Sequence, residues 1–309
     1  MYSPSPRPAR HALRPTQEGF ALVVVLWIVA LLSVLAMSSA QSTRSETIAT
    51  RNLLELTQVR TAADAAVIRG IFGLYQDLLQ QTSLTSPIRP GSGRPRPWRF
   101  QGAAITLTAM AESGKVDLNT GDEQILYGLF RAAGANEQQA LHLRDELVDY
   151  KDRDDNPRPL GAERRDYLQA GLGNGPANAP FMRIEELLLL PSMTGEVYER
   201  LAGAVTVYSR QQGIDPAVAP DLVIRALPWL APGVVENYLA ARRLAWQQGQ
   251  QPPVAMLGNA TPLLRPSLSQ VYSIRAEATL GEAHFTREAV VYLIGSPDLP
   301  FAVLAWRER

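Results

Sequence analysis

Oxygen-bearing side chains are concentrated between residues 149 and 166, which read DYKDRDDNPRPLGAERRD. Counted from Asp152 as position 1, they occupy positions 1, 3, 5 and 12, as Asp152, Asp154, Asn156 and Glu163. An EF-hand loop presents oxygen ligands to calcium at this spacing, but it normally has Gly at position 6 for a sharp turn. This chain has Pro157 there. The pattern therefore predicts an oxygen-rich loop that can wrap calcium by a path different from that of an EF-hand.

The same stretch allows a second interpretation, because it also contains four arginines: Arg153, Arg158, Arg164 and Arg165. These could pair with the acids as a solvated charged loop, in which each exposed pair contributes only about 0–1 kcal/mol. The spacing alone does not separate the two interpretations. Zinc and copper are poorly supported, because the chain has no cysteine and His142 is isolated.

Composition excludes several classes of protein. The 309 residues include 30 Lys and Arg, 30 Asp and Glu, and no Cys, so the formal net charge is zero. Without cysteine there is no disulfide scaffold, thiolate zinc site, iron–sulfur cluster or cysteine nucleophile. The three histidines suggest no Ser/His/Asp triad, and the acids have no distinctive catalytic spacing. We therefore assign no catalytic or cofactor-binding residue, and a carboxylate-dependent hydrolase is a disfavoured alternative.

Residues 20–37 form an uncharged run that predicts a membrane anchor. At 1.5 Å per residue, the 18 residues cover roughly 27 Å, close to the thickness of a bilayer core. Arg7, Arg10 and Arg14 precede the run, so the positive-inside rule places the N-terminus in the cytoplasm. The alternative is a secretory signal peptide cleaved after residues 38–40, but its apolar region is usually only about 7–15 residues long.

Apolar residues continue at three- to five-residue steps beyond the anchor to about Gln81, and there is no Pro between Phe20 and Gln81. This spacing predicts one long helix over residues 20–81. Residues 82–97 are rich in Pro, Gly and Ser and are expected to form a loop or linker.

The remaining sequence predicts an α+β domain with a helical insertion. Strand patterns occur at residues 98–110 and 301–306, and residues 271–278 and 283–294 read as a hairpin. Between them, helical spacing is found at 122–133, 136–149, 184–190, 195–202, 220–227 and 232–246.

A weak repeat lies in the helical stretch, where LPSMT at residues 190–194 matches LPWLA at residues 227–231. Both resemble degenerate helix-hairpin-helix units, in which Gly-rich hairpins expose backbone N–H groups to phosphate. The glycines are replaced here, and the chain has only two lysines, Lys115 and Lys151. Packing is the favoured explanation, and a membrane-anchored periplasmic DNA-binding protein stays the alternative function.

The N-terminal segment resembles a type IV prepilin or type II secretion pseudopilin. Glu18, Gly19 and Phe20 are followed at once by the apolar run. In that family a prepilin peptidase cuts after the Gly, which implies processing between Gly19 and Phe20. Most members have Glu five residues after the cut, whereas this chain has Val24. The absence of that Glu is typical of the K subunit, which lies at the fibre tip.

The body resembles the K pseudopilin (general secretion pathway protein K) family along nearly its whole length. The landmarks are ESGKVDLNT at 112–120, DYKDRDDN at 149–156, NAP at 178–180 and the strand at 301–306. Residues 213–215 are less typical. Family members bind calcium in the inserted domain, which implies the candidate ligands Asp152, Asp154, Asn156, Glu163 and Asp166 here.

The resemblance implies a non-enzymatic minor pseudopilin at the tip of the type II secretion pseudopilus, where it supports assembly and export across the outer membrane. Its implied partners are the I and J minor pseudopilins, prepilin peptidase and the inner membrane, without nucleic acid or a small-molecule substrate. The implied topology is single-pass, with a periplasmic body. The expected parts are a leader (1–19), a transmembrane segment (20–37), a helix continuation (38–81), an α+β pseudopilin domain (82–119 and 249–309) and an inserted helical domain (120–248).

Overall fold

A computed structural model describes residues 18–80, 91–267, 269–296 and 298–308. Its first element is the 63-residue helix α1 (Glu18–Gln80), which confirms the long helix predicted from the apolar spacing. The expected leader, apart from its last two residues, and most of the expected loop 82–97 lie outside the described residues. The chain divides into two compact units, of which the first ends at Glu55 and the second comprises Leu56–Arg309.

The first unit contains the apolar part of α1. Phe20–Ser39 is the one stretch in the described part of the chain that is long and apolar enough to cross a membrane. Its large side chains are exposed, with Phe20 and Leu22 each at 75%. An uncharged helix with apolar side chains on every face is typical of a segment surrounded by lipid.

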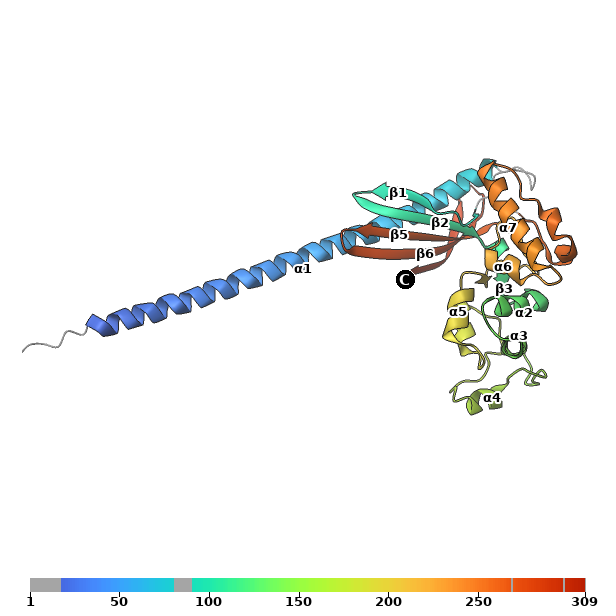
Figure 1. Ribbon diagram of the computed structural model, residues 1–309, viewed down its shortest axis with the longest axis horizontal. Helices are drawn as coiled ribbons and strands as arrows, with labels where there is room; N and C mark the ends of the chain where they lie inside the picture. Colours follow the sequence, from blue (N-terminus) through green and yellow to red (C-terminus); the bar gives the residue numbers. More distant parts are fainter. Residues whose placement is uncertain (1–17, 81–90, 268, 297, 309) are drawn as a thin grey trace, which may run out of the picture. The chain divides into compact units, whose positions relative to one another are not determined.

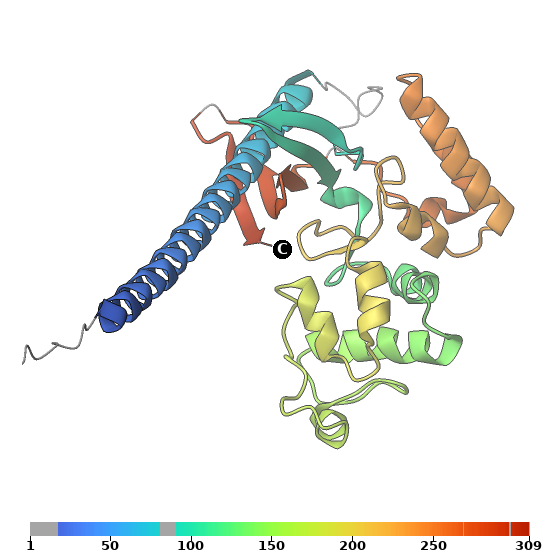
Figure 2. The same ribbon diagram turned by 60° about the vertical axis from the view of Figure 1, so that its left-hand side comes forward.

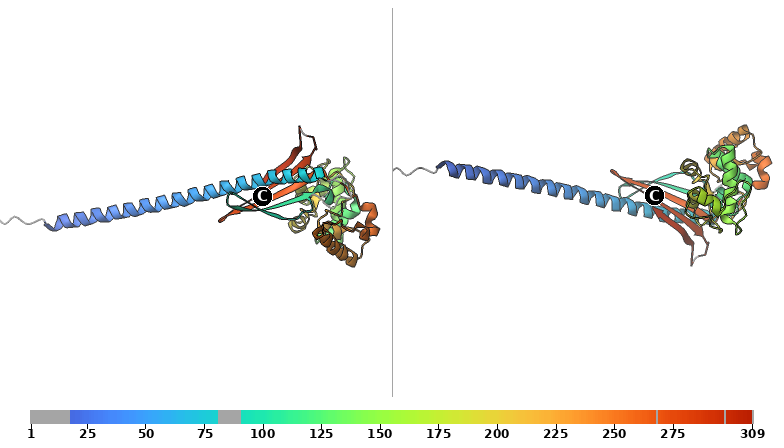
Figure 3. Two further views of the ribbon diagram at one scale, coloured as in Figure 1. Left: turned by 90° about the horizontal axis from the view of Figure 1, so that it is seen from above. Right: turned by 90° about the horizontal axis from the view of Figure 1, so that it is seen from below.

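The second unit contains a five-stranded antiparallel sheet, built from the segments in which the sequence predicts strands. Its strands are β1 (Arg96–Phe100), β2 (Ala103–Ala111), β5 (Val271–Leu280), β6 (Ala283–Leu293) and β7 (Phe301–Glu308), in the order β1-β2-β5-β6-β7. The C-terminal part of α1 lies along this sheet (Figures 1 and 3). The combination of a helix packed on an antiparallel sheet with further helices confirms the α+β class.

The contact between α1 and the sheet depends on small side chains. Ala62, Ala63 and Ala66 of α1 are buried, and Ala276 and Ala278 of β5 are buried in the same cluster. At Gly70 a Cβ would lie 3.1 Å from Ile274 Cγ2, which leaves little room for any side chain. The helix therefore approaches the sheet closely, and both surfaces lose water along the whole contact.

A second apolar cluster is built from helices, which are gathered apart from the sheet in Figure 2. The helices are α2 (Glu123–Ala132), α3 (Glu137–Lys151), α4 (Arg164–Gln169), α5 (Gly195–Leu201), α6 (Asp221–Ala226) and α7 (Pro232–Gln247), with 3₁₀ segments η1 (Glu112–Gly114), η2 (Ile184–Leu189) and η3 (Val254–Leu263). Side chains cap several N-termini, since Asp122, Asn136 and Thr194 accept from backbone N–H groups of the first turn. Such caps satisfy N–H groups that have no partner within the helix.

Some elements differ from the sequence predictions. The residues expected to form a helix at 184–190 form the 3₁₀ segment η2, and the short α4 and η3 are not predicted. Strands β3 (Val116–Asp117) and β4 (Val205–Thr206) form a small parallel pair between distant parts of the chain. Leu257 and Leu263 of η3 pack in the helical cluster, which favours an end of the helical domain beyond residue 248. The domain boundaries themselves stay predictions.

The segment that follows β2 and connects the sheet to the helical cluster contains a buried ion pair. Lys115 Nζ lies 2.6 Å from Glu112 Oε1 and 2.8 Å from Ser273 Oγ of β5. Both charged side chains are almost fully buried. Removal of one member of such a pair leaves the other charge without compensation in a medium of low polarity.

We expect Lys115→Met to lower the free energy of unfolding by about 3–5 kcal/mol, because Glu112 would stay buried and unpaired. The double variant E112Q/K115M should recover part of the loss. Urea unfolding of the full chain in detergent, followed by tryptophan fluorescence, measures both values. Equal losses in the single and double variants would show that the two side chains do not act as a pair.

Candidate metal centre

The acidic residues at the end of α3 are buried rather than solvated. Asp145, Glu146 and Asp149 are at most 3% exposed. Asp145 and Asp149 are four residues apart, so they lie on the same face of the helix. Glu146 accepts from the Ser192 N–H and hydroxyl at 3.0 and 2.6 Å, and burial raises its pKa. The end of α3 therefore supplies hydrogen-bond acceptors to neighbouring segments of the chain.

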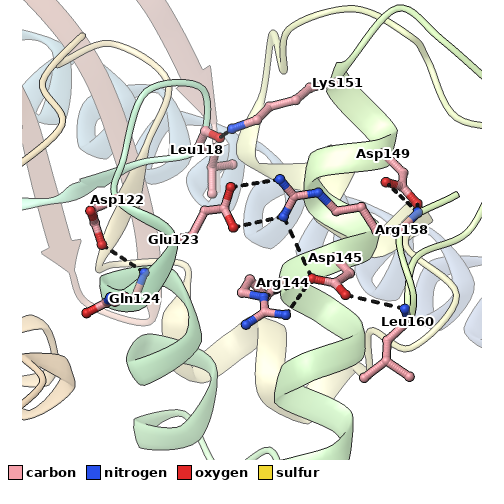
Figure 4. Close-up of polar contacts among 10 residues, drawn as sticks. All are labelled: Leu118, Asp122, Glu123, Gln124, Arg144, Asp145, Asp149, Lys151, Arg158 and Leu160. Atoms are coloured by element: carbon pink, nitrogen blue, oxygen red, sulfur yellow. Dashed lines mark hydrogen bonds and ion pairs between the residues drawn. The ribbon is translucent and has the colours of Figure 1, made fainter. Parts of the chain in front are cut away.

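Asp145 and Asp149 hold the second half of the acidic loop, residues 152–163 between α3 and α4, against α3. Asp149 Oδ2 accepts from the Arg158 N–H at 3.0 Å, and Asp145 Oδ2 accepts from the Leu160 N–H at 3.3 Å (Figure 4). At Gly161 a Cβ would lie only 1.8 Å from Asp149 Oδ2. The loop can therefore approach the carboxylate this closely only because residue 161 has no side chain.

Arg158 and Lys151 join the loop to neighbouring elements. The Arg158 guanidinium donates to both carboxylate oxygens of Glu123 in α2, at 2.8 and 3.0 Å (Figure 4). Lys151 Nζ donates to the carbonyl oxygens of Leu118 and Asn119. A bidentate guanidinium–carboxylate pair fixes orientation as well as distance. The loop is therefore positioned by α2 and α3 rather than by its own residues alone.

Two of the predicted ligands have buried oxygens without a hydrogen-bond partner. Both carboxylate oxygens of Glu163 and Oδ1 of Asp152 are in this condition. Glu163 is 5% exposed, although carboxylates are rarely buried without a partner. The two residues are eleven positions apart in the chain, and the fold brings them into one electrostatic neighbourhood. Unsatisfied carboxylate oxygens gathered in this way indicate a place for a cation.

Burial and mutual repulsion make the ionised forms of these acids less stable. Burial raises the pKa of Glu163 to about 7, and the charges of Asp149, Asp152, Asp155 and Asp154 add to the rise. Burial also raises the pKa of Asp152, with a further contribution from Asp154. Because each ionised acid destabilises the next, a bound cation would stabilise the whole group.

The other three predicted ligands have hydrogen-bond partners. Asp154 Oδ1 accepts from the Asn156 N–H and side-chain amide, each at 3.0 Å, and both residues are exposed. Asp166 Oδ2 accepts from the Glu163 N–H at 3.0 Å at the start of α4. The charge of Asp154 contributes to the raised pKa values of Asp152 and Glu163, so it lies in their neighbourhood, whereas Asp166 is already used in capping a helix.

The structure adds a residue that the loop spacing does not indicate. Asn178 Nδ2 donates to Asp155 Oδ1 at 3.2 Å, while Asn178 Oδ1 is buried without a partner. Asn178 has φ of 48°, a left-handed conformation that Asn adopts more readily than most residues. Its sequence signal is the NAP segment, but only the fold shows that this amide faces the acidic loop.

The donor set fits calcium better than a transition metal. The described residues contain no group of three or more His, Cys, Asp or Glu side chains arranged as a ready metal shell. Calcium also takes ligands from Asn oxygens, backbone carbonyls and water, in flexible geometry. The unpartnered oxygens of Asp152, Glu163 and Asn178 meet that chemical requirement. The metal ligands nevertheless stay a prediction.

The raised pKa of Glu163 gives a pH dependence to the metal-free protein. Folding then favours the protonated acid, so the free energy of unfolding should rise as the pH falls from about 7 towards the ordinary value of 4.5. Glu163→Gln should reduce this dependence, and the part that remains comes from Glu146, Asp149 and Asp152, whose pKa values burial also raises. Urea unfolding at several pH values in chelator measures it, and an unchanged slope in the variant would contradict the assignment.

Comparison with known proteins finds likenesses to the protein K family of type II secretion systems. Residues 105–210 match the family model described as type II secretion system (T2SS), protein K. Type II secretion system protein K of Klebsiella pneumoniae is 28% identical over 198 residues, which cover 60% of this chain and 61% of the relative. The putative protein K of Escherichia coli K12 is 27% identical, with 62% of each chain covered. The chain thus spans about three fifths of the length of these relatives.

Two further likenesses extend along more of the chain. Type II secretion system protein K of Pseudomonas aeruginosa is 25% identical over 258 residues, with 74% of each chain covered. A chain from the crystal structure of the GspK-GspI-GspJ complex of enterotoxigenic E. coli shares the fold, with a TM-score of 0.63 and 18% identity. That alignment covers 84% of this chain and 99% of the other. The predicted resemblance to the protein K family of type II secretion systems is confirmed, by the family model over residues 105–210 and by curated relatives at 25–28% identity.

Proposed function

We propose that this chain is a minor pseudopilin of a type II secretion system, a non-enzymatic component that supports pseudopilus assembly and protein export across the outer membrane. The observation that carries the proposal is the protein K match over residues 105–210, which includes the acidic loop and the β3–β4 pair. The long helix packed on an antiparallel sheet supports it.

The proposed location is the inner membrane, with a cytoplasmic N-terminus and a periplasmic body. Phe20–Ser39 has the length and composition of a membrane span. The arginines at positions 7, 10 and 14 favour this orientation. A prepilin peptidase would cut between Gly19 and Phe20 and leave the apolar helix attached to the body.

The proposed partners are the I and J minor pseudopilins, by analogy with the GspK-GspI-GspJ complex. Beyond the anchor, α1 offers a surface for them. Ile68 and Phe72 lie one turn apart and are 54% and 60% exposed, while the residues before them, Val67 and Ile71, are buried against the sheet. Large apolar side chains exposed on one helix face favour contact with another helix.

We also propose that the acidic loop holds calcium. The ligands would come from Asp152, Asp154, Asn156, Glu163 and Asp166, with Asn178 in addition. The unpartnered buried oxygens of Asp152, Glu163 and Asn178 support this. Calcium would supply positive charge that compensates the carboxylates, and the loop would then keep one rigid conformation for docking.

A DNA-binding function is less well supported. The Ser192 N–H in the first hairpin already donates to Glu146 Oε2 at 3.0 Å, so it is not available to a phosphate. In the second hairpin, Trp229 occupies a left-handed conformation with φ of 62° and is 56% exposed. Neither hairpin presents a cluster of lysines.

Assembly can be tested with two arginine substitutions on α1. We expect the full chain, co-expressed with the I and J pseudopilins of its own secretion system, to co-purify with both. The amount of complex recovered with the variant I68R/F72R should be at least tenfold lower, because the variant places charge on an apolar helix face. Q58R is the control, since Gln58 is exposed and lies ten residues, about 15 Å, before Ile68 along α1. Unchanged co-purification of I68R/F72R would contradict the proposed surface.

Calcium binding can be tested by thermal unfolding of the full chain in detergent. Calcium at about 100 times its Kd should raise Tm by about 5 °C or more relative to chelator. D152N/E163Q should lose this rise, because it removes two of the proposed ligand charges. E137Q is the control, since Glu137 is an exposed acid in the first turn of α3. An equal Tm in calcium and chelator would contradict the site.

Processing can be tested by co-expression with a prepilin peptidase. The protein should become 19 residues shorter, and N-terminal sequencing should begin at Phe20. Gly19→Leu should block the cut, since the cleavage depends on the residue before the bond. A mature N-terminus at Gln41 would instead indicate a secretory signal peptide.

A further inference from the structure

A cleft of about 1020 Å³ lies outside the candidate metal centre. One wall comes from the sheet and includes Leu304 of β7 and Tyr292 of β6. The opposite wall comes from loops of the helical cluster and includes Phe181, Met182 and Tyr208. Arg307 bridges the walls, since it donates to Glu185 at 3.1 Å and to Tyr208 at 3.4 Å. Figure 2 shows the end of β7 beside these loops.

One of the strands in the sheet wall of the cleft is an edge strand, β7, which lines the cleft through Leu304. β7 is the last strand in the sheet order, so one side of its backbone has no strand partner in the described part of the chain. An edge strand offers a row of N–H and C=O groups to another extended chain. This edge is therefore able to accept one more strand.

The two edges of the sheet differ in their side chains. At the opposite edge, β1 reads RPWRF, with Pro97 between two arginines. Proline and charge are devices that discourage pairing at an edge. β7 reads FAVLAWRE, without Pro, and its exposed residues include Val303, Leu304 and Trp306. The chain thus protects one edge against pairing, whereas residues 301–306 of the other edge are apolar.

A β-bulge directs Leu304 into the cleft. Val291 pairs with Val303 and Val290 pairs with Ala305, so Leu304 is the extra residue on β7. Bulges often redirect a side chain beside a binding site. Leu304 lines the cleft, whereas Val303 does not, although the two are 45% and 46% exposed.

The cleft is electrically neutral and has polar side chains in its lining. Asp117 and Arg210 are its only charged lining residues, and Asp117 Oδ2 accepts from the Arg210 N–H at 2.8 Å. Ser113 is 2% exposed, and its hydroxyl has no hydrogen-bond partner. Amide side chains such as Asn119 and Gln270 complete the polar part of the lining. This chemistry suits a peptide backbone and does not suit a phosphate or another strongly charged ligand.

The backbone of Arg210, in a loop that lines the cleft, has an unusual conformation. Its φ of 54° is uncommon for a residue other than Gly, and the conformation is held by the hydrogen bond to Asp117. Strained backbone of this kind is concentrated at binding sites. The loop that forms one wall of the cleft is therefore kept in a particular shape.

We propose that the cleft binds an extended, uncharged segment of another protein, which adds as a strand to the free edge of β7. Its backbone would pair with β7, and an apolar side chain would contact Leu304, Met182 and Tyr208. A second copy of this chain is disfavoured as the occupant. Arg307 of β7 already bonds to Glu185 and Tyr208 of the helical cluster, which hinders the approach of a second folded sheet edge. The inference does not depend on the proposed secretion role.

The test uses the full chain in detergent and a phage-displayed library of unconstrained 12-residue peptides. We expect selection to enrich uncharged, strand-forming peptides. A synthetic peptide of the enriched sequence should slow hydrogen exchange of the amides in residues 301–308 and leave residues 96–100 unchanged. Leu304→Arg should weaken its binding at least tenfold, whereas Val303→Arg should stay within twofold of the unchanged chain.

Met182→Arg on the opposite wall provides a second variant, because Met182 is 75% exposed and its replacement should not affect folding. It should also weaken binding at least tenfold. The proposal is overturned if no peptide is enriched, if protection falls on residues 96–100, or if V303R and L304R lose binding equally. Dimerisation of the unchanged chain that L304R abolishes, without peptide binding, would show a second copy as the occupant and would also overturn it.

Discussion

The arrangement of the body depends on the hydrogen bonds and ion pair of one short segment, residues 112–120. Lys115 is buried between Glu112 and Ser273 of the sheet. Asp117 accepts from the Arg210 N–H, and the side-chain amide of Asn119 donates to the Phe181 carbonyl at 2.9 Å. Because these groups are desolvated, each contact is costly to lose. The segment thereby connects the sheet, the cleft and the helical cluster.

The acidic loop shows a different balance of charge and burial. Asp145 and Asp149 are satisfied by backbone N–H groups of the loop, so the loop is held on α3 without a metal. Glu163 and Asp152 have no such partners for their buried oxygens. The first two carboxylates therefore determine where the loop lies, and the other two make its electrostatics unfavourable, which the proposed calcium would relieve. Calcium as a rigid clip is consistent with a chain that has no cysteine.

Three surfaces of the molecule support separate contacts. Phe20–Ser39 has the properties of a membrane anchor, and the exposed face around Ile68 and Phe72 offers an apolar surface to neighbouring helices. The free edge of β7 offers backbone groups beside a neutral cleft. The assembly role proposed for this chain needs several such surfaces at once, and their different chemistry would keep the contacts independent.

The sequence alone determined the long helix, the β5–β6 hairpin, the final strand and the position of the acidic loop, because apolar periodicity and residue spacing are local properties. The spacing of the acids also indicated Asp152 and Glu163 as candidate calcium ligands, which stays a prediction. Only the tertiary structure decided that Asn178 faces the loop, that Asp149 lies beneath Gly161, and that β3 pairs with β4. These contacts join residues far apart in the chain, so they depend on how the two apolar clusters pack and not on any local pattern.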